Sequence, residues 1–140
     1  MKYDGIVIYS DLDGTLLDAE RKLSKENMDA IDYFTSQGGR FGVATGRMEQ
    51  TTRIKFPDLN LNLPSIFFNG AMIYETNTDT VLYKTAMSDD LKPVLREIMS
   101  IYPKVCCEIS IHGKSYVFNP NDTAREMAER EGFELEEAPW

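Results

Sequence analysis

The sequence has little of two residue types on which much enzyme chemistry depends. Its 140 residues include one histidine, His112, and two adjacent cysteines, Cys106 and Cys107. A single imidazole argues against serine and cysteine triads and against most zinc centres. Two adjacent cysteines with no other partner form neither a disulfide framework nor a metal-ligand spacing, so we interpret them as reduced and structural. Any chemistry in this chain must therefore use carboxylates.

Basic residues are also in the minority. There are 15 lysines and arginines against 23 aspartates and glutamates, which gives a formal net charge of -8. This balance argues against nucleic-acid binding. Six glutamates crowd the last stretch, a pattern typical of a solvated helix face rather than an acidic docking tail: Glu126, Glu129, Glu131, Glu134, Glu136 and Glu137.

Long apolar runs are absent too. The first run, Ile6 to Tyr9, is too short for a secretion signal or a membrane span, so we expect a cytoplasmic protein with no membrane partner. The 42% apolar and 27% charged fractions are ordinary for a globular chain. A length of 140 residues allows one core with a small appendage.

Residues 1–85 alternate between strand and helix patterns. A helix is expected after the N-cap Ser24, and a second, shorter one after Thr45. This order predicts a parallel α/β sheet with right-handed crossovers. Buried strands are predicted at three short apolar runs: Ile6 to Ser10, Phe41 to Ala44 and Ser65 to Phe68.

The pattern changes after a predicted hairpin that pairs Met72 to Tyr74 with Val81 to Tyr83. From about Thr85 onward we expect a separate small α+β unit. Its first helix is indicated by an amphipathic stripe behind a cap at Asp90. The stripe consists of Leu91, Val94, Leu95, Ile98 and Met99.

The residues after this helix are predicted to form a hairpin and a second helix. Alternation from Val105 to Ile111 and from Ser115 to Phe118 predicts antiparallel strands that turn at His112-Gly113. His112 is thus interpreted as a turn residue rather than a ligand. A last helix from about Asp122 to Glu131 would bury Ala124, Met127 and Ala128 and end at Gly132, and nothing regular is expected after it.

Two carboxylates separated by one residue, Asp11 and Asp13, stand where the first strand ends, and Gly14 follows them. Ligands bind at the carboxyl ends of strands in open α/β sheets. Asp11 can act as a nucleophile, and Asp13 as general acid and then base. Because a carboxylate and a phosphate repel each other, a divalent cation is needed, and oxygen ligands select Mg²⁺. We expect Asp11 and Asp13 to be its ligands, the latter through its main-chain carbonyl.

The next two strands also end in polar residues. The Thr45 hydroxyl and the Gly46 amide could hold phosphoryl oxygens, and Asn69-Gly70 would lie on the same rim. Taken alone, an Asp-x-Asp-Gly segment is common in ordinary turns and calcium loops, and Asn-Gly is most often just a turn. An EF-hand loop is excluded, because Thr15, Leu16 and Lys22 stand where it needs an acid, a glycine and a glutamate.

Three segments strongly resemble the haloacid dehalogenase superfamily, and more narrowly its Cof-type phosphatases: Asp11-Leu12-Asp13-Gly14-Thr15-Leu16-Leu17, Val43-Ala44-Thr45-Gly46-Arg47 and Asn69-Gly70-Ala71. The resemblance implies a partial Rossmann-like core in residues 1–85 and the first half of a type II α+β cap in residues 86–140. It also implies magnesium and small phosphomonoesters, such as sugar phosphates, as substrates.

The resemblance also implies roles for individual residues. By motif, Asp11 would be the nucleophile that becomes phosphorylated, Asp13 the acid and base, and Thr45 the phosphate-binding hydroxyl. Arg47 would face the substrate or the cap. Gly46, Asn69 and Gly70 are counted with Thr45 as substrate-binding residues.

The sequence departs from the family pattern in two places. The family's third motif supplies a lysine and its fourth, of the Gly-Asp-x-x-Asn-Asp kind, supplies further metal-binding carboxylates, and this chain has neither. We therefore expect a truncated, N-terminal portion with little or no turnover by itself. The alternative is a catalytically inactive half-domain with a binding or structural role. A phosphoacceptor receiver domain fits poorly, because Phe67-Phe68-Asn69 offers no acceptor carboxylate.

The missing core strands also predict an association. In the family the first strand lies mid-sheet, so here Ile6 to Ser10 would become an edge. An apolar edge strand invites pairing with another chain. We expect a homodimer, or association with a further segment, through this edge.

Overall fold

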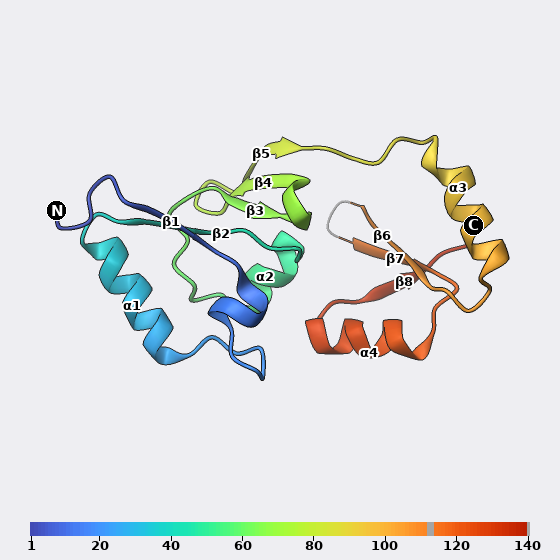
Figure 1. Ribbon diagram of the computed structural model, residues 1–140, viewed down its shortest axis with the longest axis horizontal. Coiled ribbons are helices and arrows are strands. Elements are labelled where there is room, and N and C mark those ends of the chain that lie inside the picture. The colour runs from blue at the N-terminus through green and yellow to red at the C-terminus, as the bar shows by residue number, and fades with distance from the viewer. Residues whose placement is uncertain (112–113, 140) are drawn as a thin grey trace. The chain divides into compact units, whose positions relative to one another are not determined.

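The computed structural model describes residues 1–111 and 114–139 (Figure 1). It divides the chain into two compact units, Met1–Thr85 and Ala86–Trp140, and each is described by itself. The predicted turn at His112-Gly113 lies outside the described residues. The helices and strands of the first unit are β1 (Val7–Ser10), α1 (Lys25–Ser36), β2 (Arg40–Val43), α2 (Glu49–Lys55), β3 (Ser65–Phe67), β4 (Met72–Glu75) and β5 (Thr80–Lys84).

The first unit is built on parallel strand pairing. β1 and β2 are parallel, with α1 as their connection, and β3 joins beside β2 through a parallel bridge between Ala44 and Ile66. α2 forms the second crossover. β3, β4 and β5 then pair in that order as an antiparallel sheet, which includes the predicted hairpin. The α/β fold class and the strand–helix alternation are thus confirmed.

The core of this unit includes residues at or beside the ends of the first three strands. Leu12, Val43 and Phe67 are 0% exposed, and α1 adds Ile31 at 6%. The Ser24 side chain caps α1 by accepting a hydrogen bond from the Asn27 amide at 3.1 Å, as predicted. Because Leu12 is completely buried, the loop that carries the flanking aspartates is anchored in the core.

β1 is exposed, and its predicted burial on both faces is wrong. Ile6, Val7, Ile8 and Tyr9 are 46%, 51%, 41% and 45% exposed. The physical reason is that, among the described residues, β1 pairs with β2 alone and forms the edge of a two-stranded sheet. The predicted edge position is confirmed.

The second unit is a three-stranded sheet with two helices. The order of its strands is β6-β7-β8, with β6 and β7 antiparallel and β7 and β8 parallel. Val117 on β7 is 0% exposed. Its helices and strands are α3 (Leu91–Ile101), β6 (Cys107–Ile111), β7 (Lys114–Phe118), α4 (Asp122–Glu131) and β8 (Leu135–Glu137).

Two expectations for this unit are wrong. The residues after Gly132 are not irregular, because β8 pairs with β7 there. Met127 is 36% exposed rather than buried, whereas Ala128 of the same helix is buried at 6%. The positive φ of Gly132, 74°, matches its predicted place as the C-cap of α4.

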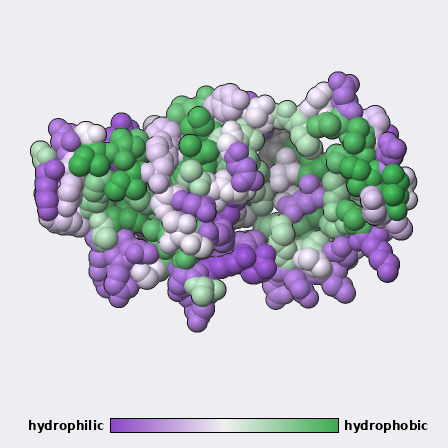
Figure 2. All heavy atoms as spheres, viewed as in Figure 1, coloured by the Kyte–Doolittle hydropathy of each residue, from purple (hydrophilic) through white to green (hydrophobic). Residues whose placement is uncertain are grey.

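The apolar face of α3 is largely uncovered. Leu91, Val94, Ile98 and Ile101 are 40–59% exposed, and Figure 2 shows hydrophobic surface over this helix. Cys106 and Cys107 are free thiols, and burial raises the pKa of both. Within the described ranges, none of the helices combines the length and apolar character needed to cross a bilayer.

Candidate active site

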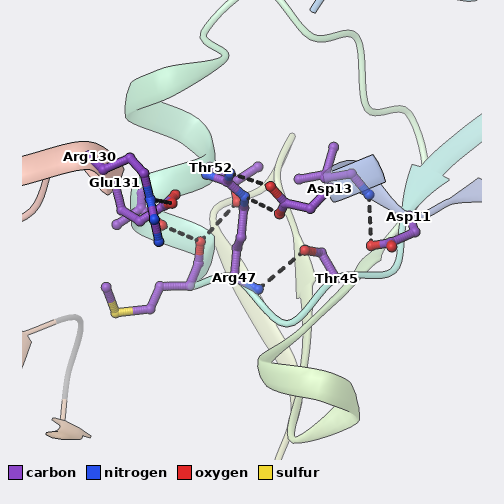
Figure 3. A network of polar contacts seen from close by, with 10 residues as sticks. Asp11, Asp13, Thr45, Arg47, Thr52, Arg130 and Glu131 are labelled. Atoms are coloured by element: carbon purple, nitrogen blue, oxygen red, sulfur yellow. Dashed lines mark hydrogen bonds and ion pairs between the residues drawn. The ribbon is translucent and has the colours of Figure 1, made fainter. Parts of the chain in front are cut away.

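Backbone hydrogen bonds hold the ends of the first three strands level with one another. The Ala44 amide donates to the Ser10 carbonyl at 2.9 Å, and the Thr45 amide donates to the Ile66 carbonyl at 2.9 Å. The residues that follow each strand therefore start from one rim. Figure 3 shows Asp11, Asp13, Thr45 and Arg47 gathered there.

The first strand leads into a tight turn that carries both aspartates. The Asp11 Oδ1 atom accepts a hydrogen bond from the Leu12 amide at 2.8 Å. The turn Leu12–Leu16 is closed by a bond from the Leu17 amide to the Leu12 carbonyl at 2.9 Å, and Gly14 has a φ of 74°. The backbone at position 14 has a left-handed conformation, and glycine adopts it without the strain that a side chain would cause. The Asp11 carboxylate is thus fixed at the end of the strand.

Asp13 is held by Arg47 in a bidentate ion pair. Arg47 Nε lies 2.7 Å from Asp13 Oδ2, and Arg47 Nη2 lies 2.7 Å from Asp13 Oδ1. The Arg47 side chain is 7% exposed and that of Asp13 is 40% exposed. Hydrogen bonds from Arg47 lower the pKa of Asp13, against the opposing effect of partial burial. Asp13 is therefore held in its ionised form.

Thr45, Gly46 and Asn69 lie together. The Thr45 side chain is buried, and its Oγ1 atom accepts a hydrogen bond from the Arg47 amide at 3.2 Å. The Asn69 amide donates to the Thr45 carbonyl at 3.2 Å. A Cβ atom at position 46 would lie 2.9 Å from Asn69 Oδ1, so a larger residue there would displace the Asn69 side chain. Gly70, with a φ of 98°, turns the chain directly afterwards.

The structure brings the predicted site residues together at this rim. The contact that Arg47 makes there differs from the predicted one. Sequence reasoning placed Arg47 toward the substrate or cap, whereas its guanidinium holds Asp13 here. The roles of all these residues in catalysis and binding stay predictions.

Three residues near Asp13 were not singled out from the sequence. Arg21 and Lys55 lower the pKa of Asp13 through their charge. The Phe56 ring centroid lies 5.8 Å from Arg47 Cζ. Lysines are common in the last turn of a helix because their charge interacts favourably with the helix dipole. The sequence alone therefore gives no reason to assign Lys55 to the site.

The donors on the rim are those that magnesium prefers. Mg²⁺ is often bound through one or two carboxylates with water and phosphate oxygens completing the coordination. The Asp11 carboxylate and the Asp13 carbonyl fit that chemistry. Among residues 1–111 and 114–139, no group of three or more His, Cys, Asp or Glu side chains could hold a metal ion.

The chain belongs to the haloacid dehalogenase-like hydrolase family, whose model matches residues 8–138. It is similar to the pyridoxal phosphate phosphatase YbhA of Escherichia coli, with 32% identity over 111 residues, covering 79% of this chain and 38% of YbhA. It is also similar to the 5-amino-6-(5-phospho-D-ribitylamino)uracil phosphatase YitU of Bacillus subtilis, with 28% identity over 97 residues, covering 69% of this chain and 36% of YitU.

Solved structures share the fold. A haloacid dehalogenase-like hydrolase from Bacteroides thetaiotaomicron superposes with a TM-score of 0.83 at 21% identity, covering 99% of this chain and 52% of that one. A sugar phosphatase of HAD subclass IIB superposes with a TM-score of 0.78 at 20% identity, covering 94% and 51%. The predicted resemblance and the fold class are confirmed. The chain spans less than two fifths of the length of the two curated relatives and about half of these structures.

Proposed function

We propose that this chain carries the nucleophile half of a magnesium-dependent phosphohydrolase that acts on small phosphomonoesters. The observation that carries the proposal is the placement of Asp11 and Asp13 on the same rim as the buried Thr45. The names of the curated relatives, which are phosphatases of small phosphorylated metabolites, support it.

Asp11 is the proposed nucleophile. Its carboxylate oxygen attacks phosphorus, the ester P–O bond breaks, and an aspartyl phosphate forms on Asp11. The leaving oxygen takes a proton from Asp13. In the second step Asp13 removes a proton from water, which attacks the same phosphorus and releases phosphate and the free Asp11 carboxylate.

The ion pair between Asp13 and Arg47 suits only the second of these steps. A lowered pKa makes Asp13 a carboxylate that can accept a proton from water, but a poor donor to the leaving group. We propose that Arg47 turns from Asp13 toward the substrate when a phosphomonoester binds. Without that cation the pKa of Asp13 rises toward its ordinary value, which makes Asp13 a better proton donor.

The neighbouring strand ends would bind the transferred group. The Thr45 hydroxyl and the amides of Gly46 and Gly70 are suited to donate to phosphoryl oxygens, and the Asn69 side chain lies beside Gly46. Asp11 and the Asp13 carbonyl would hold Mg²⁺. When bound, Mg²⁺ offsets the repulsion between the nucleophile and the phosphate dianion.

The chain by itself should be inactive or weakly active. It lacks the lysine and the acidic motif that the family places at the same site, and the loss of one electrostatic donor can cost roughly a hundredfold or more in rate.

We propose that residues 86–140 form the first half of a cap. Pairing along β1, with a second copy or a further polypeptide segment, would cover the exposed edge.

The second candidate function is a half-domain with a binding or structural role and no turnover. The lack of a three-carboxylate group among the described residues favours it. Phosphate release from p-nitrophenyl phosphate, measured together with binding of Mg²⁺ and inorganic phosphate, separates the two functions. Turnover that needs Mg²⁺ and disappears in Asp11→Asn, but not in the surface control Asp4→Asn, supports the enzyme. A folded chain without turnover that binds Mg²⁺ and phosphate, and loses that binding in Asp11→Asn, supports the nucleophile half. A folded chain that releases no phosphate and binds Mg²⁺ only weakly supports the half-domain, and turnover that survives Asp11→Asn rules out the proposed nucleophile.

A further inference from the structure

The main chain of Arg47 is fixed at the rim, but its side chain is long. The Arg47 amide donates a hydrogen bond to Thr45 Oγ1 at 3.2 Å, and its carbonyl accepts one from the Phe68 amide at 3.1 Å. The guanidinium forms the ion pair with Asp13, and the side chain is only 7% exposed. Ordering a side chain with this many rotatable bonds costs conformational entropy, which contacts along its length must offset.

The Phe56 ring provides one such contact. Its centroid lies 5.8 Å from Arg47 Cζ, within the roughly 6 Å over which an aromatic face attracts a guanidinium. Arg47 precedes α2 and Phe56 follows it, so the Arg47 side chain extends along the helix toward the ring. The ring and the Asp13 carboxylate therefore both contribute to the placement of the guanidinium.

Phe56 is itself held in place. Its amide donates to the Thr52 carbonyl at 2.9 Å as the cap of α2, and its carbonyl accepts a hydrogen bond from the Leu59 amide at 3.1 Å. Its half-buried ring packs against the core of the first unit, to which the buried Leu59 belongs. The Phe56 ring is thus a fixed surface for the guanidinium.

We propose that Phe56 is a positioning residue for Arg47. Its ring keeps the guanidinium at the rim when Arg47 turns from Asp13 toward the phosphoryl oxygens. An aromatic face suits this role because it attracts a guanidinium without occupying any of its N–H donors, whereas a carboxylate occupies them. This inference rests on the proposed function, in which Arg47 contacts the phosphoryl group.

Graded fluorination of the ring tests the inference, because fluorine weakens the negative face of an aromatic ring and changes its size little. Phe56 is replaced in the 140-residue chain by 4-fluoro-, 3,5-difluoro- and 3,4,5-trifluorophenylalanine. Hydrogen exchange of the Arg47 Nε proton is measured by NMR without added ligand, and Arg47→Gln identifies the signal. Exchange should become faster with each fluorine, by about three- to fivefold for the trifluoro ring. The comparison isolates the contribution of the ring, whatever else Arg47 contacts.

Inorganic phosphate tests the part of the inference that concerns binding. It is titrated in the presence of Mg²⁺ and followed at the amides of Thr45 and Gly46. Phosphate should bind about three- to fivefold more weakly to the trifluoro chain than to the wild-type chain. Phe56→Leu, which keeps an apolar side chain without an aromatic face, should show the same loss. Phe56→Tyr keeps the aromatic face and should retain the wild-type affinity.

The matched control is the same fluorination at Phe41, a buried ring on β2 of the same unit. It should change neither the exchange at Arg47 nor the affinity for phosphate. If exchange is equally fast at every degree of fluorination of Phe56, the ring does not hold the guanidinium. If fluorination at Phe41 acts as strongly as at Phe56, the effect comes from packing in general. Faster exchange with unchanged phosphate affinity would also overturn the inference, because Arg47 would then not act on phosphate through the ring.

Failure of the proposed function gives a different result. If phosphate leaves the amides of Thr45 and Gly46 unshifted in the wild-type chain, the proposed phosphoryl site is wrong. Graded exchange at Arg47 would still show that Phe56 positions the guanidinium, since that measurement needs no ligand. If phosphate shifts Thr45 and Gly46 with the same affinity in the wild-type and trifluoro chains, the role of Phe56 is wrong and the proposed function stands.

Discussion

At the scale of single residues, the protonation of Asp13 depends mainly on one neighbour, Arg47. Arg47 makes two hydrogen bonds of 2.7 Å to its carboxylate, and these are the largest cause of its lowered pKa. In Arg47→Gln the pKa of Asp13 should rise toward its ordinary value of about 3.9. Carboxyl carbon shifts followed against pH would measure it. Arg53→Gln, which removes a cation paired with Asp79 instead, should leave the pKa of Asp13 in place.

The same pair makes stability depend on pH in a defined direction. Because the pKa of Asp13 is lower in the folded chain, the ion pair stabilises the fold above the unfolded pKa of about 3.9. That contribution is lost as the pH falls through the lower folded value. Wild-type and Arg47→Gln chains should therefore differ more in urea midpoint at pH 6 than at pH 2.5. An equal difference at both pH values would contradict this account.

Gly46 offers a second test at this scale. A methyl group at position 46 would lie 2.9 Å from Asn69 Oδ1, so Gly46→Ala should displace the Asn69 side chain. Because the exposed Asn69 side chain can move, we expect a loss of only about 0.5–1 kcal/mol in the free energy of unfolding. Asn69→Gly removes the clashing side chain and accepts the φ of 53° found there. The double variant should thus recover most of the loss, and additive effects in urea unfolding would disprove the clash.

The sequence predicts which residues reach the rim better than it predicts their contacts. Asp11, Asp13, Thr45 and Asn69 stand one to three residues after strand ends, and strand ends of a parallel sheet meet at one edge. The bond between Arg47 and Asp13 joins residues 34 positions apart and depends on side-chain geometry, which no local pattern encodes.

At the scale of secondary-structure elements, a polar cluster ties the β4–β5 turn to α2. Arg53 Nη1 on α2 lies 2.6 Å from Tyr74 Oη on β4 and 2.9 Å from Asp79 Oδ1 in the turn, and Tyr74 also donates to Asp79. Tyr74→Phe removes the shared hydroxyl and should cost about 1 kcal/mol in urea unfolding. Tyr83→Phe, on an exposed residue of β5, should cost much less. If both variants lose the same free energy of unfolding, the hydrogen bonds of this cluster do not stabilise the fold.

The elements that could be predicted are those whose pattern is local. α1 has a cap at Ser24 and a helical apolar spacing, and β2 is a short apolar run, so both were found from the sequence. β8 was missed because Leu135–Glu137 is acidic, and only its pairing with β7 makes it a strand. The burial of β1 was predicted wrongly because an apolar run reports which residues can be buried, not which neighbours are present to cover them.

At the scale of the whole molecule, the β1 edge predicts self-association. Ile6, Val7, Ile8 and Tyr9 are each more than 40% exposed, and among the described residues β1 pairs only with β2. An apolar strand with unpaired backbone groups favours pairing with another chain. Light scattering of the 140-residue chain should therefore show a mass that rises with concentration above that of a 16.0 kDa monomer.

A charged side chain on the β1 edge should prevent the predicted self-association. Val7→Lys places a cation on the exposed side of β1, where bringing two copies together would repel, so the mass should fall toward the monomer. Ile54→Lys introduces the same charge on α2, at a residue that is 64% exposed, and should leave the association unchanged. If the wild-type chain is folded and strictly monomeric across the concentration range, β1 is not an association edge. If both lysine variants reduce the mass equally, net charge rather than the β1 edge controls the association.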